Sequence, residues 1–228
     1  MMKKYNYIPV DLNLPPLSLV EGEEGRTYLT PSGKRLPSVT TVTGFEGKEG
    51  FDIWRRKNPR ESIRVLDRGN KLHSMMEHLL KNEDVELTED MEINSLFMMT
   101  KNHVEHCIDN VYALEQQMWS ETIGLAGRAD CICDYNGKLS IVDFKGSNKE
   151  KTESGIKNYF QQATAYALMY REISGKKVEQ IVVLAACETG VLQEFIKKPI
   201  DYVDGLLKSI QLYKQWHELK PSSATLFS

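Results

Sequence analysis

The chain has 228 residues, 41% of them hydrophobic, and a formal net charge of -3. These values are typical of a globular protein with one full core, and the slight acidity argues against a generally basic nucleic-acid coat protein. No run of 18 apolar residues is present, and the first seven residues lack the apolar segment of a signal peptide. We therefore expect a cytoplasmic protein without a membrane partner.

The four cysteines stand at positions 107, 131, 133 and 187, without the CxxC pairs that mark a zinc site. We interpret them as small core side chains in a reducing compartment. At the start, residues 1–26 are rich in proline and acid, which predicts an irregular arm. Residues 26–43 have strand composition around a turn at 31–33. The hydroxyls of Ser38 and Thr40 are candidates for phosphate contact, although strands commonly carry threonine for its β propensity.

The segment 54–71 is strongly basic, with seven cationic residues against two acidic ones. Arg60, Arg64 and Arg68 follow i, i+4 spacing, so on a helix they form one cationic stripe. Such a stripe can neutralise phosphates along a nucleic-acid strand, and the alternative is a solvated helix face.

The next segment, 70–80, has an apolar helical face beside which His73 and Glu77 are spaced i, i+4. An imidazole and a carboxylate so placed can bind one ion, or can form a simple surface contact. Residues 89–117 predict a second helix, and Glu121 is expected on a short strand after it.

Two alternating, β-branched-rich segments flank Asn136-Gly137, the strongest short-range signal for a type I′ hairpin. With Tyr135 opposite Lys138, this register places Asp130 directly opposite Asp143, with Cβ atoms about 4.5–5.5 Å apart. Lys145, two residues beyond Asp143, lies on the same face.

Facing carboxylates are destabilising unless a proton, a cationic side chain or a bound cation compensates their charge. Magnesium fits this pair because it takes carboxylate oxygens and bridges them to substrate phosphates. The alternative is a pair of exposed edge charges with Lys145 as their salt-bridge partner.

The polar loop after Lys145 carries Lys149 where a phosphate backbone would enter. A helix is predicted over 156–173, with Gln162 and Tyr166 sharing one face. A buried strand over 177–187, a strand over 191–196 and a closing helix over 200–219, ended by Pro221, follow. The order of elements predicts an α/β fold, a mixed central sheet flanked by helices, with an N-terminal helical elaboration.

Taken in order, a helical His73, Gly127-x-x-Asp130, Asp143-x-Lys145 and Gln162-x-x-x-Tyr166 resemble the motifs of the RecB-like branch of the PD-(D/E)XK nucleases. Within that branch the chain is similar to the mitochondrial genome maintenance exonucleases and related phage exonucleases. The likeness includes Leu36-Pro-Ser-Val-Thr-Thr-Val42. It covers about residues 36–215 and implies a restriction-endonuclease-like core.

The resemblance implies that Asp130 and Asp143 hold a metal ion and that the Phe144 carbonyl is a further ligand. It makes His73 a ligand or organiser of the site and Lys145 the residue that orients and activates the attacking water. Gln162 and Tyr166 line the site. Two departures are that Asp143 stands where many relatives have Glu, and that the iron-sulfur cysteines of some relatives are absent.

We expect a single domain over 36–220, with a helical part over about 48–117 and a catalytic core over about 118–220. An arm over 1–35, which includes the start of the first strand pair, and a tail over 221–228 flank it. The expected activity is that of an Mg²⁺-dependent exonuclease, with Mn²⁺ able to substitute and without an iron-sulfur cluster. The expected partner of the protein is DNA, and single-stranded DNA in particular. We expect the protein to be a monomer in the cytoplasm, or in the host cytoplasm if it is phage-encoded. A non-cleaving nucleic-acid-binding module and a structure-specific endonuclease are the alternatives.

Overall fold

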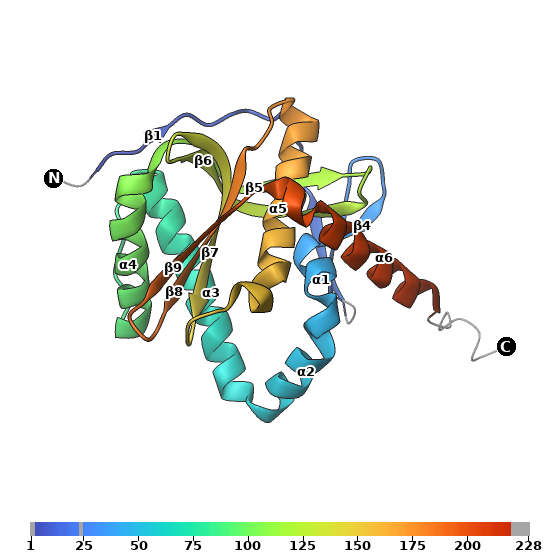
Figure 1. Ribbon diagram of the computed structural model, residues 1–228, viewed down its shortest axis with the longest axis horizontal. Helices are drawn as coiled ribbons and strands as arrows, with labels where there is room; N and C mark the ends of the chain where they lie inside the picture. Colours follow the sequence, from blue (N-terminus) through green and yellow to red (C-terminus); the bar gives the residue numbers. More distant parts are fainter. Residues whose placement is uncertain (1–2, 23–24, 220–228) are drawn as a thin grey trace.

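A six-stranded mixed sheet, ordered β1-β5-β6-β7-β8-β9, forms the centre of the protein (Figure 1). The computed structural model describes residues 3–22 and 25–219. Strands β5, β6 and β7 are antiparallel neighbours, β7 runs parallel to β8, and β9 closes the far edge antiparallel to β8. The strands span Asn6–Tyr7 (β1), Ile108–Ser120 (β5), Leu125–Tyr135 (β6), Lys138–Ser147 (β7), Gln180–Cys187 (β8) and Leu192–Lys197 (β9).

A second, antiparallel sheet is built from β2 (Ser18–Gly22), β3 (Gly25–Leu29) and β4 (Arg35–Pro37). Residues 1–26 were predicted to be irregular. The pairing of β2 with β3, and of β1 in parallel with β5, shows that this prediction is wrong in part. The predicted tail 221–228, including Pro221, lies outside the described residues.

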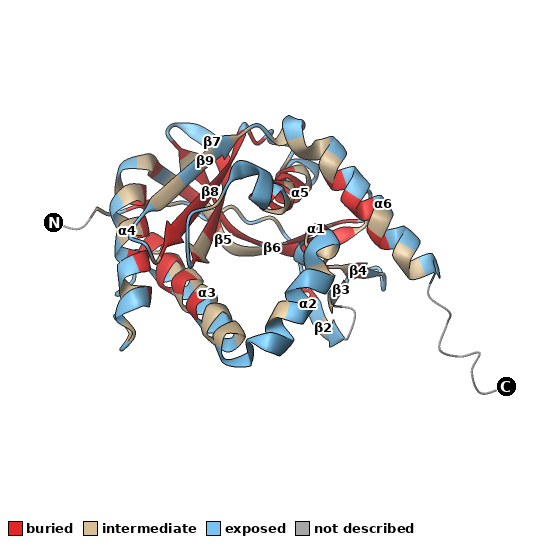
Figure 2. Ribbon diagram, turned by 60° about the horizontal axis from the view of Figure 1, so that its bottom comes forward, coloured by how far each residue is buried: buried red, intermediate tan, exposed pale blue. Residues whose placement is uncertain are grey.

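Helices cover both faces of the central sheet (Figures 1 and 2). Buried side chains of α3 and α4 pack on one face, and those of α1, α5 and α6 pack on the other. Among the described residues, no helix combines the length and the apolarity that crossing a membrane requires. The α-helices span Val39–Thr43 (α1), Lys48–Lys57 (α2), Pro59–Leu80 (α3), Met91–Cys107 (α4), Lys157–Ser174 (α5) and Val203–Leu219 (α6), with 3-10 turns at Phe45–Gly47, Glu153–Ile156 and Pro199–Tyr202.

The hairpin register predicted from the sequence is confirmed. Asn136 and Gly137 have φ angles of 50° and 73°, as a type I′ turn requires at both central positions. Tyr135 pairs with Lys138, and the ladder continues to Cys131 opposite Val142. One further step along this register brings the two aspartates, at positions 130 and 143, opposite each other.

Three further predictions of secondary structure are wrong. Residues 39–43, predicted as strand, form α1, because the Ser38 hydroxyl accepts a hydrogen bond from the backbone N–H of Thr41 and so caps a helix. Residues 108–117, predicted as helix, belong to β5, whose pairing with β1 and β6 overrides the helix propensity of Ala, Leu, Glu and Gln. Glu121, predicted on a short strand, lies instead in the turn after β5, where it contacts Ser32 and Lys34.

The last third agrees with the prediction. Helix α5 begins and ends within one residue of the expected bounds, and every residue of β8 is buried, as its continuous apolar run indicated. A 3-10 turn at Pro199–Tyr202 precedes α6, which therefore begins at Val203. Figure 2 shows that buried residues, drawn in red, are concentrated in the central strands.

Candidate active site

Strands β6 and β7 hold two carboxylates whose oxygens are oriented by the chain itself. Asp130 Oδ2 accepts a hydrogen bond of 2.9 Å from the backbone N–H of Phe144. Asp143 Oδ1 accepts one of 2.7 Å from Lys145 Nζ and one of 3.0 Å from Gln162 Nε2. One oxygen of each aspartate is thus fixed by neighbours from β7 and α5, which leaves the other oxygen for a different partner.

Helix α3 and strand β5 add an imidazole and a third carboxylate. His73 Nδ1 lies 3.4 Å from Asp130 Oδ1 and 3.7 Å from Glu115 Oε1. The other oxygen of Glu115 is 2.7 Å from Nε of Arg128, whose side chain is 56% exposed. One potential ligand atom from each of His73, Glu115 and Asp130 lies within 4.8 Å of the other two.

Sequence reasoning missed Glu115 because the segment that carries it was predicted to be helical. Its neighbours Leu114 and Gln116 pair with Cys131 and Ala129, which places Glu115 beside Asp130. Its φ angle of 48° is uncommon for a residue with a side chain. Val111 and Ala113 are buried on alternate positions of the strand, but the sequence from Val111 to Leu114 is apolar throughout, so no alternation in the sequence indicates a strand here.

Gly127 and Tyr166, which belong to two separate motifs, are in contact. A Cβ atom at position 127 would lie 2.8 Å from the Tyr166 hydroxyl oxygen, closer than real Cβ contacts. The glycine therefore lets α5 approach β6, which keeps Gln162, one turn earlier on α5, in contact with Asp143.

The charges in the site depend on one another. Burial raises the pKa of Asp143 to about 6, even though the Lys145 ammonium opposes the shift. For Asp130 the same burial effect is outweighed by the charge of His73, so its pKa lies below the usual value. Burial lowers the pKa of His73, but Asp130 and Glu115 outweigh it and raise that pKa to about 10. Burial also lowers the pKa of Lys145, yet the attraction of Asp143 and Asp130 leaves it raised.

The donor set fits a hard divalent cation. Asp143 is 2% exposed, and its Oδ2 is buried without a hydrogen-bond partner among the described residues. A buried carboxylate oxygen without a partner is costly, and a cation is a natural partner for it. Oxygen-rich sites of this kind favour Mg²⁺ or Mn²⁺. With its raised pKa, His73 is protonated at neutral pH and would have to lose a proton to act as a ligand.

A cleft of about 580 Å³ opens over these groups. The predicted site residues that line it include Ser38, Thr40 and Glu77, besides His73, Asp130, Lys145, Gln162 and Tyr166. Ser38 is buried, and its hydroxyl is hydrogen-bonded to the hydroxyls of Thr40 and Thr41. Glu77 forms an ion pair of 2.7 Å with Lys81. Residues that the sequence reasoning did not single out also line the cleft, among them Arg26, Tyr28, Asn70, Glu115 and Arg128.

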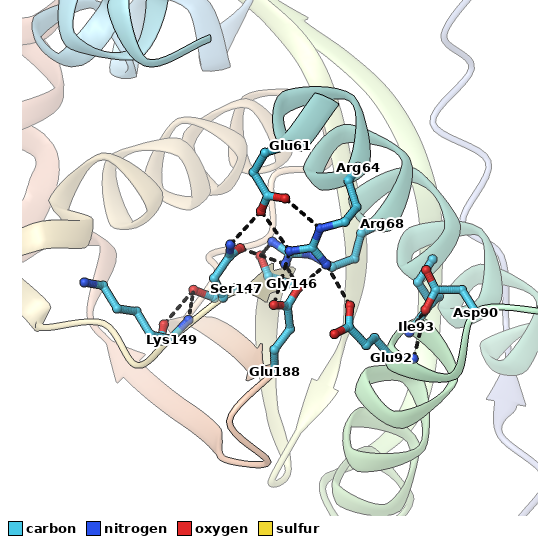
Figure 3. A network of polar contacts seen from close by, with 11 residues as sticks. Glu61, Arg64, Arg68, Asp90, Glu92, Ile93, Gly146, Ser147, Lys149 and Glu188 are labelled. Carbon is cyan, nitrogen blue, oxygen red and sulfur yellow. Dashed lines mark hydrogen bonds and ion pairs between the residues drawn. The ribbon is translucent and has the colours of Figure 1, made fainter. Parts of the chain in front are cut away.

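Five predicted residues are absent from the described part of the cleft lining: Asp143 and Phe144, which are buried, and Arg64, Arg68 and Lys149. Figure 3 shows Arg64 and Arg68 in a network with acidic residues. Arg68 is 2% exposed, pairs with Glu188 and donates to the Gly146 carbonyl at 3.1 Å. Arg64 contacts Glu188 as well as Glu61 and Glu92. The predicted cationic stripe is therefore wrong at these two positions, because their charges are used to fasten α3 to the sheet.

Residues 48–215 match the family model of the PD-(D/E)XK nuclease superfamily. The chain belongs to this superfamily, and the mixed sheet flanked by helices agrees with its fold.

Among curated proteins, the chain is similar to the human mitochondrial genome maintenance exonuclease 1, with 29% identity over 106 residues, or 46% of this chain and 29% of that protein. The mouse protein is 27% identical over 105 residues, again 46% of this chain and 29% of that one. The match thus spans less than a third of these relatives. The crystal structure of a presumed exonuclease from Eubacterium rectale overlays with a TM-score of 0.45 and 13% identity, covering 83% of this chain and 72% of that one.

Proposed function

We propose that the protein is a metal-dependent DNA exonuclease that hydrolyses phosphodiester bonds of single-stranded DNA or DNA ends in DNA processing, replication or recombination. The observation that carries this proposal is the arrangement of Asp130, Asp143 and Lys145, in which one buried carboxylate oxygen has no hydrogen-bond partner in the described part of the chain. The exonucleases to which 46% of the chain is similar support the reaction type. Mg²⁺ is the proposed ion, with Mn²⁺ able to replace it, and a cytoplasmic monomer is the proposed working form.

The bound cation would supply Lewis-acid polarisation of the scissile phosphate and a more acidic water. Asp130 and Asp143 would hold it, and the Phe144 N–H and Gln162 keep the two carboxylates oriented. Burial lowers the Lys145 pKa, but attraction by Asp143 and Asp130 leaves it raised in the metal-free site, where the ammonium group donates a hydrogen bond to Asp143. The Lys145 ammonium group orients the attacking oxygen and stabilises the negative charge that develops on it or on the phosphate.

The recessed position of the site favours a single strand. Asp143 is 2% exposed and the Lys145 side chain is 20% exposed, so the scissile phosphate must enter the cleft to reach them. A single strand bends to present one phosphate, whereas a duplex stays stiff over about 150 base pairs. Arg26 and Arg128 line the cleft and provide cations for the flanking phosphates.

The test is digestion of 5′-labelled and 3′-labelled single-stranded DNA with Mg²⁺, Mn²⁺ or EDTA. Matched duplex and RNA substrates define the preference, and Asp143→Asn is the control with a side chain of nearly the same shape. We expect shortening from one end that needs the metal and vanishes in the variant, with the two labels giving the polarity. Internal cuts would instead support an endonuclease, and DNA binding without cleavage in either metal would support a binding module.

A further inference from the structure

A second cluster of potential metal ligands lies at the other end of the hairpin. His103 and Cys107 are spaced i, i+4 on α4, so both side chains point to one side of the helix. Glu194 reaches them from the edge strand β9. Ligand atoms of these three residues lie within 4.8 Å of one another. Tyr135, which supports the cluster, lies five residues from Asp130 along β6, or roughly 16 Å at the usual rise of a strand.

The separations fit a tetrahedral ion. A zinc ion about 2.0–2.1 Å from nitrogen or oxygen and about 2.3 Å from sulfur requires N to S and N to O separations of about 3.6 and 3.3 Å. His103 Nε2 is 3.7 Å from Cys107 Sγ and 3.0 Å from Glu194 Oε1. Two of the three separations therefore lie within a few tenths of an ångström of the tetrahedral values, and the ligand atoms of all three residues lie within 4.8 Å of one another.

The surroundings hold these side chains in place while leaving them accessible. The Tyr135 hydroxyl donates to Glu194, and burial raises the Tyr135 pKa, so this hydroxyl stays protonated. The Cys107 carbonyl accepts from the Asn136 backbone N–H at 2.7 Å, which ties the end of α4 to the hairpin turn. The side chains of His103 and Glu194 are 30% and 34% exposed, and Cys107 is the one cysteine that is not buried.

We propose that His103, Cys107 and Glu194 bind one zinc ion, with water in the fourth position. A thiolate and an imidazole select zinc over the hard cations that suit the carboxylate site. The ion would join the end of α4 to the edge strand β9. Its role is structural, because these three residues lie far from the cleft that holds Asp130 and Lys145.

The experiment uses the whole chain, freed of metal by a chelator, and titrates it with Co²⁺ or Zn²⁺ alone. Cobalt bound to a thiolate gives a near-ultraviolet charge-transfer band that oxygen ligands do not give. We expect this band to saturate at one ion per chain, and Zn²⁺ to displace the cobalt. Cys107→Ser should abolish the band, and His103→Ala should weaken Zn²⁺ binding by at least about tenfold, since loss of a supporting partner alone costs about 10–100-fold.

Two controls separate this site from others. His106→Ala removes an exposed imidazole from the same helix and should leave the band intact, as should Asp143→Asn at the carboxylate site. A wild-type protein without the band, or a band that survives Cys107→Ser, would overturn the proposal. If Cys107→Ser does not fold, alkylation of wild-type Cys107 decides: Zn²⁺ should slow it, and an unchanged rate would refute the site.

Discussion

Replacing Asp143 with asparagine should stabilise the metal-free protein while abolishing its cleavage activity. The carboxylate is 2% exposed, and burial raises its pKa from the ordinary value of 3.8 to about 6. The folded state then holds this proton more tightly than the unfolded state, so ionisation favours unfolding. The stability that this proton contributes decreases as the pH rises from about 4 through about 6. Above that range the contribution is fully lost. A shift of about two units corresponds to about 3 kcal/mol at neutral pH.

Asparagine avoids this cost because it keeps the shape of the side chain and cannot ionise. Its oxygen can still accept from Lys145 and Gln162, as Asp143 Oδ1 does. The assay is chemical denaturation of both proteins in EDTA across the acidic and neutral range. We expect the variant to be more stable by about 3 kcal/mol near neutral pH, and by about half as much at pH about 5.

Two outcomes would refute this reasoning. A variant that is less stable at every pH would show that the ion pair between Asp143 and Lys145 contributes more than burial costs. A stability difference that does not change with pH would show that Asp143 does not titrate in this range. Saturating Mg²⁺ supplies a further check, because it should raise the unfolding midpoint of the wild type and not that of the variant.

Other substitutions test other contacts of the site. Gly127→Ala should cost about 1–3 kcal/mol in denaturation, because its Cβ would lie 2.8 Å from the Tyr166 hydroxyl; unchanged stability would contradict this. Arg68→Met should cost about 3–5 kcal/mol by leaving the partly buried Glu188 with fewer partners, and a second change, Glu188→Leu, should recover part of the loss. Lys145→Ala should abolish cleavage but spare DNA binding in a gel-shift assay; loss of both would make Lys145 structural. Glu115→Gln should weaken Mg²⁺ binding measured by calorimetry, and an unchanged affinity would place Glu115 outside the metal site.

The hairpin and its carboxylates could be predicted because local chemistry determines them. Asn136-Gly137 fixes the turn type, the turn fixes the register, and the register brings Asp130 and Asp143 together. The same holds for β8, where an uninterrupted apolar segment permits a buried strand. In these segments, local propensity and tertiary structure agree.

The remainder depends on partners distant in sequence. Residues 108–117 were predicted as the end of a helix, but pairing with β6 makes the segment a strand, and Glu115 was missed for that reason. The i, i+4 spacing of Arg64 and Arg68 indicated a free cationic face, yet Glu188, more than a hundred residues away, forms ion pairs with both. Sequence spacing on one helix cannot show which acids a distant turn will bring to it.

The contact between Gly127 and Tyr166 couples the effects of mutations at two positions that are far apart in the sequence. Because a Cβ at 127 and the ring at 166 compete for the same space, enlarging the first position requires shrinking or moving the second. Each change alone carries a penalty, so the two positions should change in pairs across related chains. A library that randomises only one of them should return glycine or tyrosine, whereas joint randomisation should also return functional pairs of larger and smaller residues.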